Sequence, residues 1–128
     1  SPERDETLEQ LAALLANPES LVWEVAGTDE APGARGQLVG VPGGREAVLV
    51  TAGLAPLAPG QAYQVWLLRE GTPVPNALFQ VRQGGEGSLV VRSATRLRDV
   101  DVIAVTPEPA SGSPAPTGPI VLAGQLAA

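Results

Sequence analysis

The amino-acid sequence predicts an all-β domain: an antiparallel β-sandwich of about eight strands, preceded by one short N-terminal helix. Three observations support this fold class. The 128 residues include 15 glycines and 13 prolines, spread between short apolar runs as turn residues are. These runs recur about every ten residues, with no helical pattern between them. Apolar residues make up 44% of the chain, which suffices for one core at this length.

The N-terminal segment is the one stretch with a helical pattern. Residues 3–16 carry acidic residues in the first turn, where the helix dipole favours them, and Asn17–Pro18 ends the pattern. The apolar residues at helical spacing are Leu8, Leu11, Ala12 and Leu15. Because so short a helix is marginal alone, we expect it to dock on the rest of the domain.

The remaining chain divides into β-favouring runs separated by turn sequences. The predicted strands are residues 21–26, 36–41, 47–52, 62–69, 76–81, 88–92, 102–106 and 120–126. Runs 62–69 and 47–52 are apolar on nearly both faces. We therefore expect both to be central strands, with the second face of 62–69 covered by a loop or by the N-terminal helix.

A proline-rich stretch, TPEPASGSPAPTGP at residues 106–119, separates the last two predicted strands. Proline pre-extends a chain and lowers the entropy lost on ordering it. We expect this stretch to cross the end of the sandwich and to deliver residues 120–126 to the opposite sheet as an integral strand. Ile120, Val121, Leu122 and Leu126 would then enter the core. The alternative is that SPAPTGP binds a partner or a protease as a polyproline helix.

Several reactive residue types are missing from the sequence. Cys, His, Met and Lys do not occur, and all eight basic residues are arginines. Catalytic triads, thiol nucleophiles, Schiff bases and zinc or copper sites therefore lack their usual side chains. The net charge of −6 disfavours nucleic acid and anionic membranes as partners. We expect a protein that is not an enzyme and that has no cofactor, no catalytic residues and no metal site.

Two carboxylate pairs are the remaining candidates for chemistry. Asp99 and Asp101 would share one face of an extended segment and could contribute to a Ca²⁺ site, but no third carboxylate stands nearby. The alternative is that both are solvated. Glu46 and Glu70 could act as a glycosidase-like pair only if the fold brought them together. Each adjoins an arginine, as strand-end surface charges do.

Glycine clusters and aromatic residues have structural interpretations. We predict that Gly43–Gly44 and the GGEG at residues 84–87 are hairpin turns, because neither has the Lys-Ser/Thr element of a phosphate loop. The four aromatic residues are Trp23, Tyr63, Trp66 and Phe79. They lie within apolar runs, so we expect core positions for them and no stacking platform.

Two segments resemble the C-terminal domain of anti-sigma-K factors. They are residues 47–81, which contain GLAPLAPGQAYQVWL and GTPVPNALF, and residues 101–124, which contain AVTPEPASGSPAPTGPIVLAG. The residues that match the first pattern are Leu54, Pro56, Leu57, Pro59, Gly60, Tyr63, Gln64, Trp66 and Leu67. Those that match the second are Val105, Thr106, Glu108, Pro109, Gly112, Ser113, Pro114, Pro116, Thr117, Gly118 and Pro119. The resemblance spans residues 21–126.

The resemblance implies the extracytoplasmic domain of a bacterial single-pass membrane protein. In that family, a cytoplasmic domain holds an extracytoplasmic-function sigma factor inactive, and stepwise proteolysis of the anti-sigma factor releases it. Residues 1–20 would form a juxtamembrane helix or stalk, and residues 21–128 the sandwich domain. The sigma factor would bind the cytoplasmic domain, which this chain lacks, and a protease or sensor protein could act outside the membrane.

Two further expectations concern the setting of the chain. It begins at Ser1 without Met and has no run near the length of a membrane span. We therefore expect this segment to be soluble and the full reading frame to carry an apolar run of about 20 residues upstream. The alternative function is a secreted or surface β-sandwich that binds carbohydrate or a protein partner.

Overall fold

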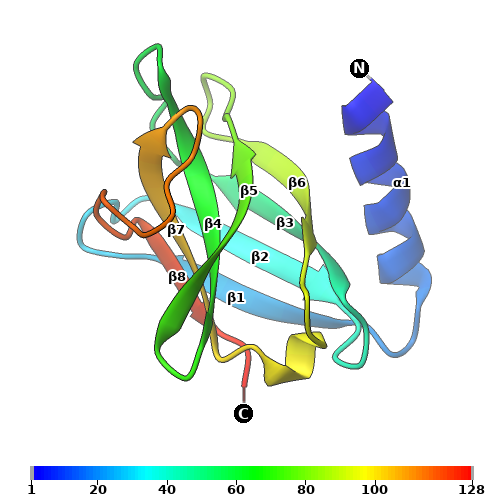
Figure 1. Cartoon of the computed structure of the whole chain (residues 1–128). Coiled ribbons are helices and arrows are strands. Elements are labelled where there is room, and N and C mark those ends of the chain that lie inside the picture. The colour runs from blue at the N-terminus through cyan, green and yellow to red at the C-terminus, as the bar shows by residue number, and fades with distance from the viewer. Residues whose placement is uncertain (1, 128) are drawn as a thin grey trace.

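A computed structural model describes residues 2–127 and shows a strongly bent β-sheet with one helix beside it (Figure 1). The elements in chain order are α1 (Pro2–Ala16), β1 (Leu21–Gly27), β2 (Arg35–Gly40), β3 (Glu46–Ala52), β4 (Gln61–Arg69), β5 (Thr72–Phe79), β6 (Gly87–Arg92), the short 3₁₀ helix η1 (Leu97–Asp99), β7 (Val102–Pro109) and β8 (Leu122–Gln125). No helix within residues 2–127 is long and apolar enough to cross a membrane.

All eight strands belong to one antiparallel sheet. Their order is β5-β4-β7-β8-β1-β2-β3-β6. The sheet curls until its two edges, β5 and β6, approach each other, and the side-chain amide of Asn76 donates to the carbonyl of Arg92 at 2.8 Å across this seam. The prediction of an antiparallel all-β domain with eight strands and one N-terminal helix is confirmed. The two halves of the nearly closed sheet face each other across one core.

The core lies inside the curled sheet and follows the period-two alternation of its strands. On β4, Tyr63, Val65 and Leu67 point inward, opposite Ile103 and Val105 of β7. The inner residues of the other strands join them. The residues less than 2% exposed include Val25, Leu38, Leu49, Leu54, Val91, Leu97 and Leu122. One side-chain layer from each half therefore fills the interior.

Helix α1 covers the outer face of β2, β3 and β6 (Figure 1). Leu14, 8% exposed, packs with Val39 and Val48, so the second apolar face of β3 is explained by the helix. The predicted apolar set docks only in part, because Leu11 packs against this cluster whereas Leu8 and Leu15 are 48% and 62% exposed. The other docking residues are Thr7 and Leu14, each of which precedes an exposed leucine by one residue and so lies about 100° from it around the helix axis.

The second face of β4 is covered by the loop that follows β7. Gln64 on this face bonds to Ser113 of the loop, and Trp66 beside it is fully buried. The expectation that β4 is a central strand with both faces covered is confirmed, and its cover is a loop. The core prediction is also confirmed for Trp66, Tyr63 and Phe79, while Trp23 is partly buried.

The hairpin between β4 and β5 turns on two residues with left-handed backbone conformations. Glu70 has φ 52° and Gly71 has φ 79°, as a two-residue type I′ turn requires. The backbone N–H of Glu70 donates to the carboxylate of Asp101 at 2.7 Å. This bond holds a non-glycine residue in a conformation that costs it about 1–2 kcal/mol.

Strand β5 begins at Thr72, earlier than the predicted start at residue 76. Pro73 and Pro75 are accommodated in β5 because it is an edge strand, where a missing N–H is tolerated. The loop with Gly84–Gly87 connects β5 to β6, which do not pair in the sheet. The prediction of a hairpin there was therefore wrong, whereas Gly43–Gly44 do lie in the hairpin of β2 and β3.

The last strand is integral to the sheet, but its expected position was wrong. β8 does not cross to an opposite sheet; it pairs with β7, the strand just before it, and with β1. It is the strand that joins β5-β4-β7 to β1-β2-β3-β6. Leu122 is fully buried and Val121 and Leu126 are nearly so, but Ile120 is 45% exposed and is not a core residue.

We predict that Leu122→Ala lowers the free energy of unfolding by about 2–5 kcal/mol, because it leaves a cavity where the two halves of the sheet join. Ile120→Ala is the matched control and should change it by less than about 0.5 kcal/mol. Urea unfolding followed by tryptophan fluorescence measures both values. Equal effects of the two substitutions would contradict the central position of β8.

Candidate functional site

The end of β7 and the loop after it form a buried polar cluster around Glu108. Thr106 and Glu108 lie on the outer face of β7, next to Gln64 and Ala62 of β4. The loop, residues 110–121, folds back over this face before β8 begins (Figure 1). Glu108 is only 1% exposed although it is ionisable. Its side chain is therefore the feature of this motif that most needs a physical explanation.

Both carboxylate oxygens of Glu108 are fully engaged. Oε1 accepts from the hydroxyls of Ser113, at 2.7 Å, and Thr117. Oε2 accepts from the Thr106 hydroxyl at 2.6 Å and from the backbone N–H groups of Thr117 and Gly118, at 3.0 and 3.1 Å. Hydrogen bonds to an ionised acceptor are stronger than neutral ones. The carboxylate thus ties the loop to β7 at two places, Ser113 and Thr117–Gly118.

These donors determine the protonation state of Glu108. Burial by itself raises the pKa of the carboxyl, because it penalises the charged form. The bonds from Thr106, Thr117 and Ser113 outweigh burial and lower the pKa from 4.5 to about 2. Glu108 is therefore a carboxylate at neutral pH, and its charge is what the surrounding donors stabilise.

Two residues of β4 complete the cluster. The side-chain amide of Gln64 accepts from the Ser113 N–H at 2.9 Å and donates to the Ser113 carbonyl at 3.1 Å. The indole N–H of Trp66 donates to the Thr106 hydroxyl oxygen at 2.8 Å, and that hydroxyl donates to Glu108. The loop is therefore bonded to the sheet through two strands.

Two glycines allow the loop to follow this path. Gly112 has φ 86°, a conformation that other residues rarely adopt. A Cβ on Gly118 would lie 2.1 Å from the Pro107 carbonyl oxygen, so only glycine fits where the backbone N–H meets Glu108. These two constraints explain why glycine stands at both ends of the GSPAPTG segment.

The cluster acts as a structural lock. Glu108 has no exposed oxygen to offer a substrate, and its lowered pKa makes it a poor proton acceptor near neutral pH.

The sequence analysis did not predict this structural role of Glu108. The signal lay in the hydroxyl residues at 106, 113 and 117 around a lone Glu, but nothing local shows that they converge. The polyproline-ligand hypothesis concerns Pro114 and Pro116, which are exposed outside these bonds, and it stays a prediction.

The carboxylate pairs singled out in the sequence have separate roles. Asp101 accepts from the Glu70 N–H, and Asp99 lies in η1. Glu46 pairs with Arg92 across β3 and β6 at 3.0 Å, both side chains being largely exposed. Within the described residues, no three His, Cys, Asp or Glu side chains gather as metal ligands would. Glu46 and Glu70 thus interact with different partners and form no pair.

We predict that Glu108→Gln destabilises the domain and flattens its response to acid. The folded pKa of Glu108 lies below its unfolded value, so its contribution of about 3 kcal/mol is present above pH 4.5 and is lost as the pH falls toward 2. Unfolding free energies at pH 7, 4 and 2.5 measure this. The difference between wild type and variant should shrink with acid; a constant difference would contradict the assigned pKa.

We predict that Gly118→Ala lowers the free energy of unfolding by about 1–3 kcal/mol, because the new methyl group would overlap the Pro107 carbonyl. Gly33→Ala is the control, since a Cβ there meets nothing within 4 Å. It should be neutral or slightly stabilising. Thermal or urea unfolding compares the two, and a neutral Gly118→Ala would refute the tight loop path.

Comparison with known proteins shows to which family the chain is related. The family model described as "Anti-sigma-K factor rskA, C-terminal" matches residues 1–120. An "Uncharacterized protein in phr 5'region" of Streptomyces griseus is 30% identical over 115 residues, which cover 89% of this chain and 46% of that protein. The chain thus spans about half the length of this curated relative. No solved structure matches. Since the family model covers nearly the whole chain, the chain belongs to the family of anti-sigma-K factor RskA C-terminal domains.

Proposed function

We propose that this chain is the extracytoplasmic regulatory domain of a membrane-anchored anti-sigma factor. The observation that carries the proposal is the family match over residues 1–120. In this proposal a cytoplasmic segment outside the chain binds an extracytoplasmic-function sigma factor, and regulated proteolysis releases it. Residues 1–20 link the membrane span to the β-domain formed by residues 21–128.

The geometry of the Glu108 cluster supports a regulatory, non-catalytic role. Among the carboxylates of residues 2–127, the one whose pKa is strongly shifted is Glu108, which is buried and saturated with donors, so its function is to hold the loop. A carbohydrate-binding function has less support. Such sites stack sugars on exposed rings, whereas Tyr63, Trp66 and Phe79 are buried and Trp23 is partly so.

The fold also suits a domain whose unfolding exposes the chain to a protease. Its sheet is joined in the middle by the short strand β8, so loss of the loop that delivers β8 would open the two halves. A protease cleaves such a domain in proportion to how often it opens. Destabilising the lock should therefore lead to more proteolysis and more free sigma factor.

The test uses the full-length gene with two readouts. An alkaline phosphatase fused after residue 128 reports the side of the membrane, because this enzyme is active only outside the cytoplasm. A promoter that depends on the cognate sigma factor reports its release. We expect an active fusion, and several-fold higher promoter activity for Gly118→Ala than for the Gly33→Ala control.

Two results would contradict the proposal. An inactive phosphatase fusion, with an active cytoplasmic reporter at the same position, would place the domain inside the cell. Unchanged promoter activity in Gly118→Ala, with the purified variant shown to be destabilised, would disconnect the domain from sigma-factor control.

A further inference from the structure

The seam between β5 and β6 is where the sheet stays open. These strands are its two edges, and a side-chain bond from Asn76 links them at Arg92. The Nδ2 of Asn76 donates to the Arg92 carbonyl, and its Oδ1 accepts from the Ala77 N–H at 2.9 Å. Beyond this bond, no strand within residues 2–127 pairs with β6 on the side away from β3. We call this side the β6 edge.

The antiparallel pattern identifies the backbone groups that the β6 edge presents. The Ser93 N–H donates to the Arg45 carbonyl, which continues the β3 side of the ladder, whereas the Arg92 carbonyl points to Asn76. Since successive residues alternate in direction, Ser88 and Val90 direct their N–H and C=O groups to the open edge. An unpaired row of this kind is a template for another strand.

The opposite edge, β5, is a poor template. Pro73 and Pro75 have no N–H to offer, and the N–H of Ala77 is already bonded to the side chain of its neighbour. Prolines on an edge are a common protection against unwanted pairing. The β6 edge has no proline, so the two sides of the seam differ in their capacity to bind a strand.

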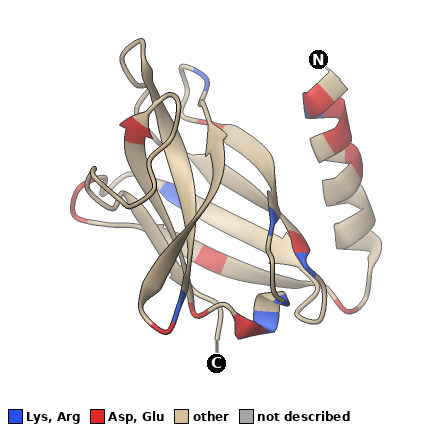
Figure 2. Ribbon diagram, viewed as in Figure 1, with Lys and Arg blue, Asp and Glu red and all other residues tan. Residues whose placement is uncertain are grey.

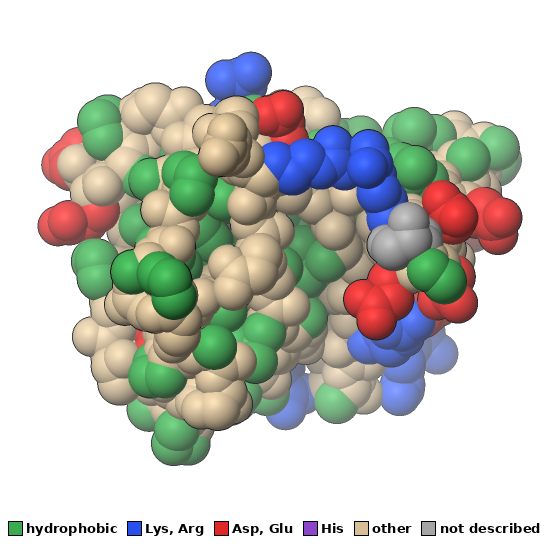
Figure 3. Space-filling model, turned by 90° about the horizontal axis from the view of Figure 1, so that it is seen from above, with side chains coloured by type: hydrophobic (Ala, Val, Ile, Leu, Met, Phe, Trp, Pro, Cys, Tyr) green, Lys and Arg blue, Asp and Glu red, His purple; other side chains and the backbone are tan. Residues whose placement is uncertain are grey.

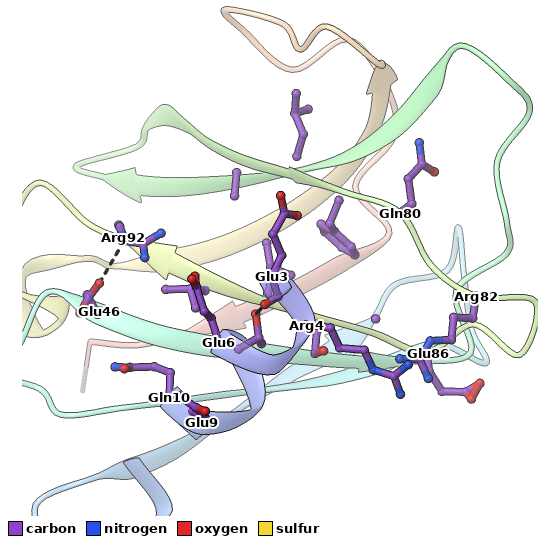
Figure 4. Close-up of a pocket in the computed structure, with 18 residues that line it drawn as sticks. Glu3, Arg4, Glu6, Glu9, Gln10, Glu46, Gln80, Arg82, Glu86 and Arg92 are labelled. Atoms are coloured by element: carbon purple, nitrogen blue, oxygen red, sulfur yellow. Dashed lines mark hydrogen bonds and ion pairs between the residues drawn. The ribbon is translucent and has the colours of Figure 1, made fainter. Parts of the chain in front are cut away.

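A groove of about 1070 Å³ runs along the β6 edge (Figure 4). Its walls are the N-terminal half of α1 on one side and the end of β5 on the other, and Ser88 and Val90 lie between them. Leu78 of β5, 40% exposed, gives that wall an apolar patch. This volume is large enough for a peptide segment rather than a single side chain.

The groove carries more negative than positive charge. Five glutamates and three arginines line it, and Arg92 is paired with Glu46. Glu3, Glu6 and Glu9 are all exposed and belong to α1, whose first half is acidic in Figure 2. Charged side chains gather around this end of the helix in Figure 3. An occupant with basic side chains would complement this wall.

We propose that the β6 edge binds an extended, basic segment of a partner protein, which adds a strand to the sheet in the groove beneath α1. Main-chain bonds to Ser88 and Val90 supply the pairing, and contacts with the α1 glutamates supply the preference for basic side chains. A second copy of this chain fits less well, because pairing two β6 edges would bring two acidic grooves together in a molecule of net charge −6. This proposal rests on the β6 edge and on the charges that line the groove, and it does not depend on control of a sigma factor.

The probe is the peptide Lys-Val-Lys-Thr-Lys-Val-Lys-Thr, titrated into ¹⁵N-labelled protein of residues 1–128. We expect amide shifts centred on Ser88 and Val90, and slower hydrogen exchange of these two amides. Two N-methylated peptides, one methylated at every Lys and one at every Val and Thr, keep the charge and remove alternate N–H groups. Only one of them should lose binding, because an added strand uses the N–H groups of alternate residues.

The charge contribution is tested on the protein. Glu3→Gln, Glu6→Gln and Glu9→Gln together should weaken peptide binding about tenfold at low salt. The matched control is Glu19→Gln, Asp29→Asn and Glu30→Gln, which makes the same change in net charge at exposed positions outside the groove. It should weaken binding less than about threefold. Circular dichroism confirms that α1 remains helical in both.

Several outcomes would overturn the proposal. These are no binding of the peptide at millimolar concentration, equal binding of both N-methylated peptides, or shifts that map away from β6. Equal losses in the two triple variants would show attraction to net charge alone. A concentration-dependent dimer with protection at Ser88 and Val90 in the absence of peptide would assign the edge to a second copy.

Discussion

The bonds that Glu108 accepts decide how the chain returns to its own sheet. Ordering the loop of residues 110–121 costs conformational entropy, which the prolines lower and the carboxylate bonds offset. Thr117 and Gly118 are held at one end of the loop and Ser113 in its middle, so Val121 arrives beside Val105 and bonds to it at 2.9 Å. From that point β8 can pair with β7 on one side and β1 on the other. The core is closed only when β8 takes this position between β7 and β1.

A charged lock is an unusual choice for a site that is nearly fully buried. A buried carboxylate is costly unless its partners replace the water it loses, and here three hydroxyls and two backbone N–H groups do so. An apolar side chain would fill the space but would leave those donors unpaired. The bonds are directional, so they specify one loop path where apolar packing would admit several.

The outer face of the curled sheet is covered by a loop on one half and by a helix on the other, and the two covers are held with different strength. The loop over β4 and β7 is bonded to the buried side chains of Gln64 and Glu108. The helix over β2, β3 and β6 is held by a small apolar cluster around Leu14 and leaves Leu8 and Leu15 in solvent. Local opening costs less free energy where few buried contacts hold an element, so we expect α1 and the β5–β6 seam to open more readily than the loop over β4 and β7.

The sequence by itself determined the features that depend on near neighbours. Period-two alternation, turn glycines and prolines, and an acidic first helical turn indicated eight strands and one helix, because each is set within a few residues. The motif in residues 101–124 also pointed to the family. Only the tertiary structure decided what that motif does. Ser113 meets Gln64 across 49 positions and Thr106 meets Trp66 across 40, and no local pattern encodes such partners. No local pattern shows that β8 pairs with β7 either, because that pairing depends on the register of the whole sheet. Likewise, the helix face that docks depends on the apolar surface that the sheet leaves uncovered.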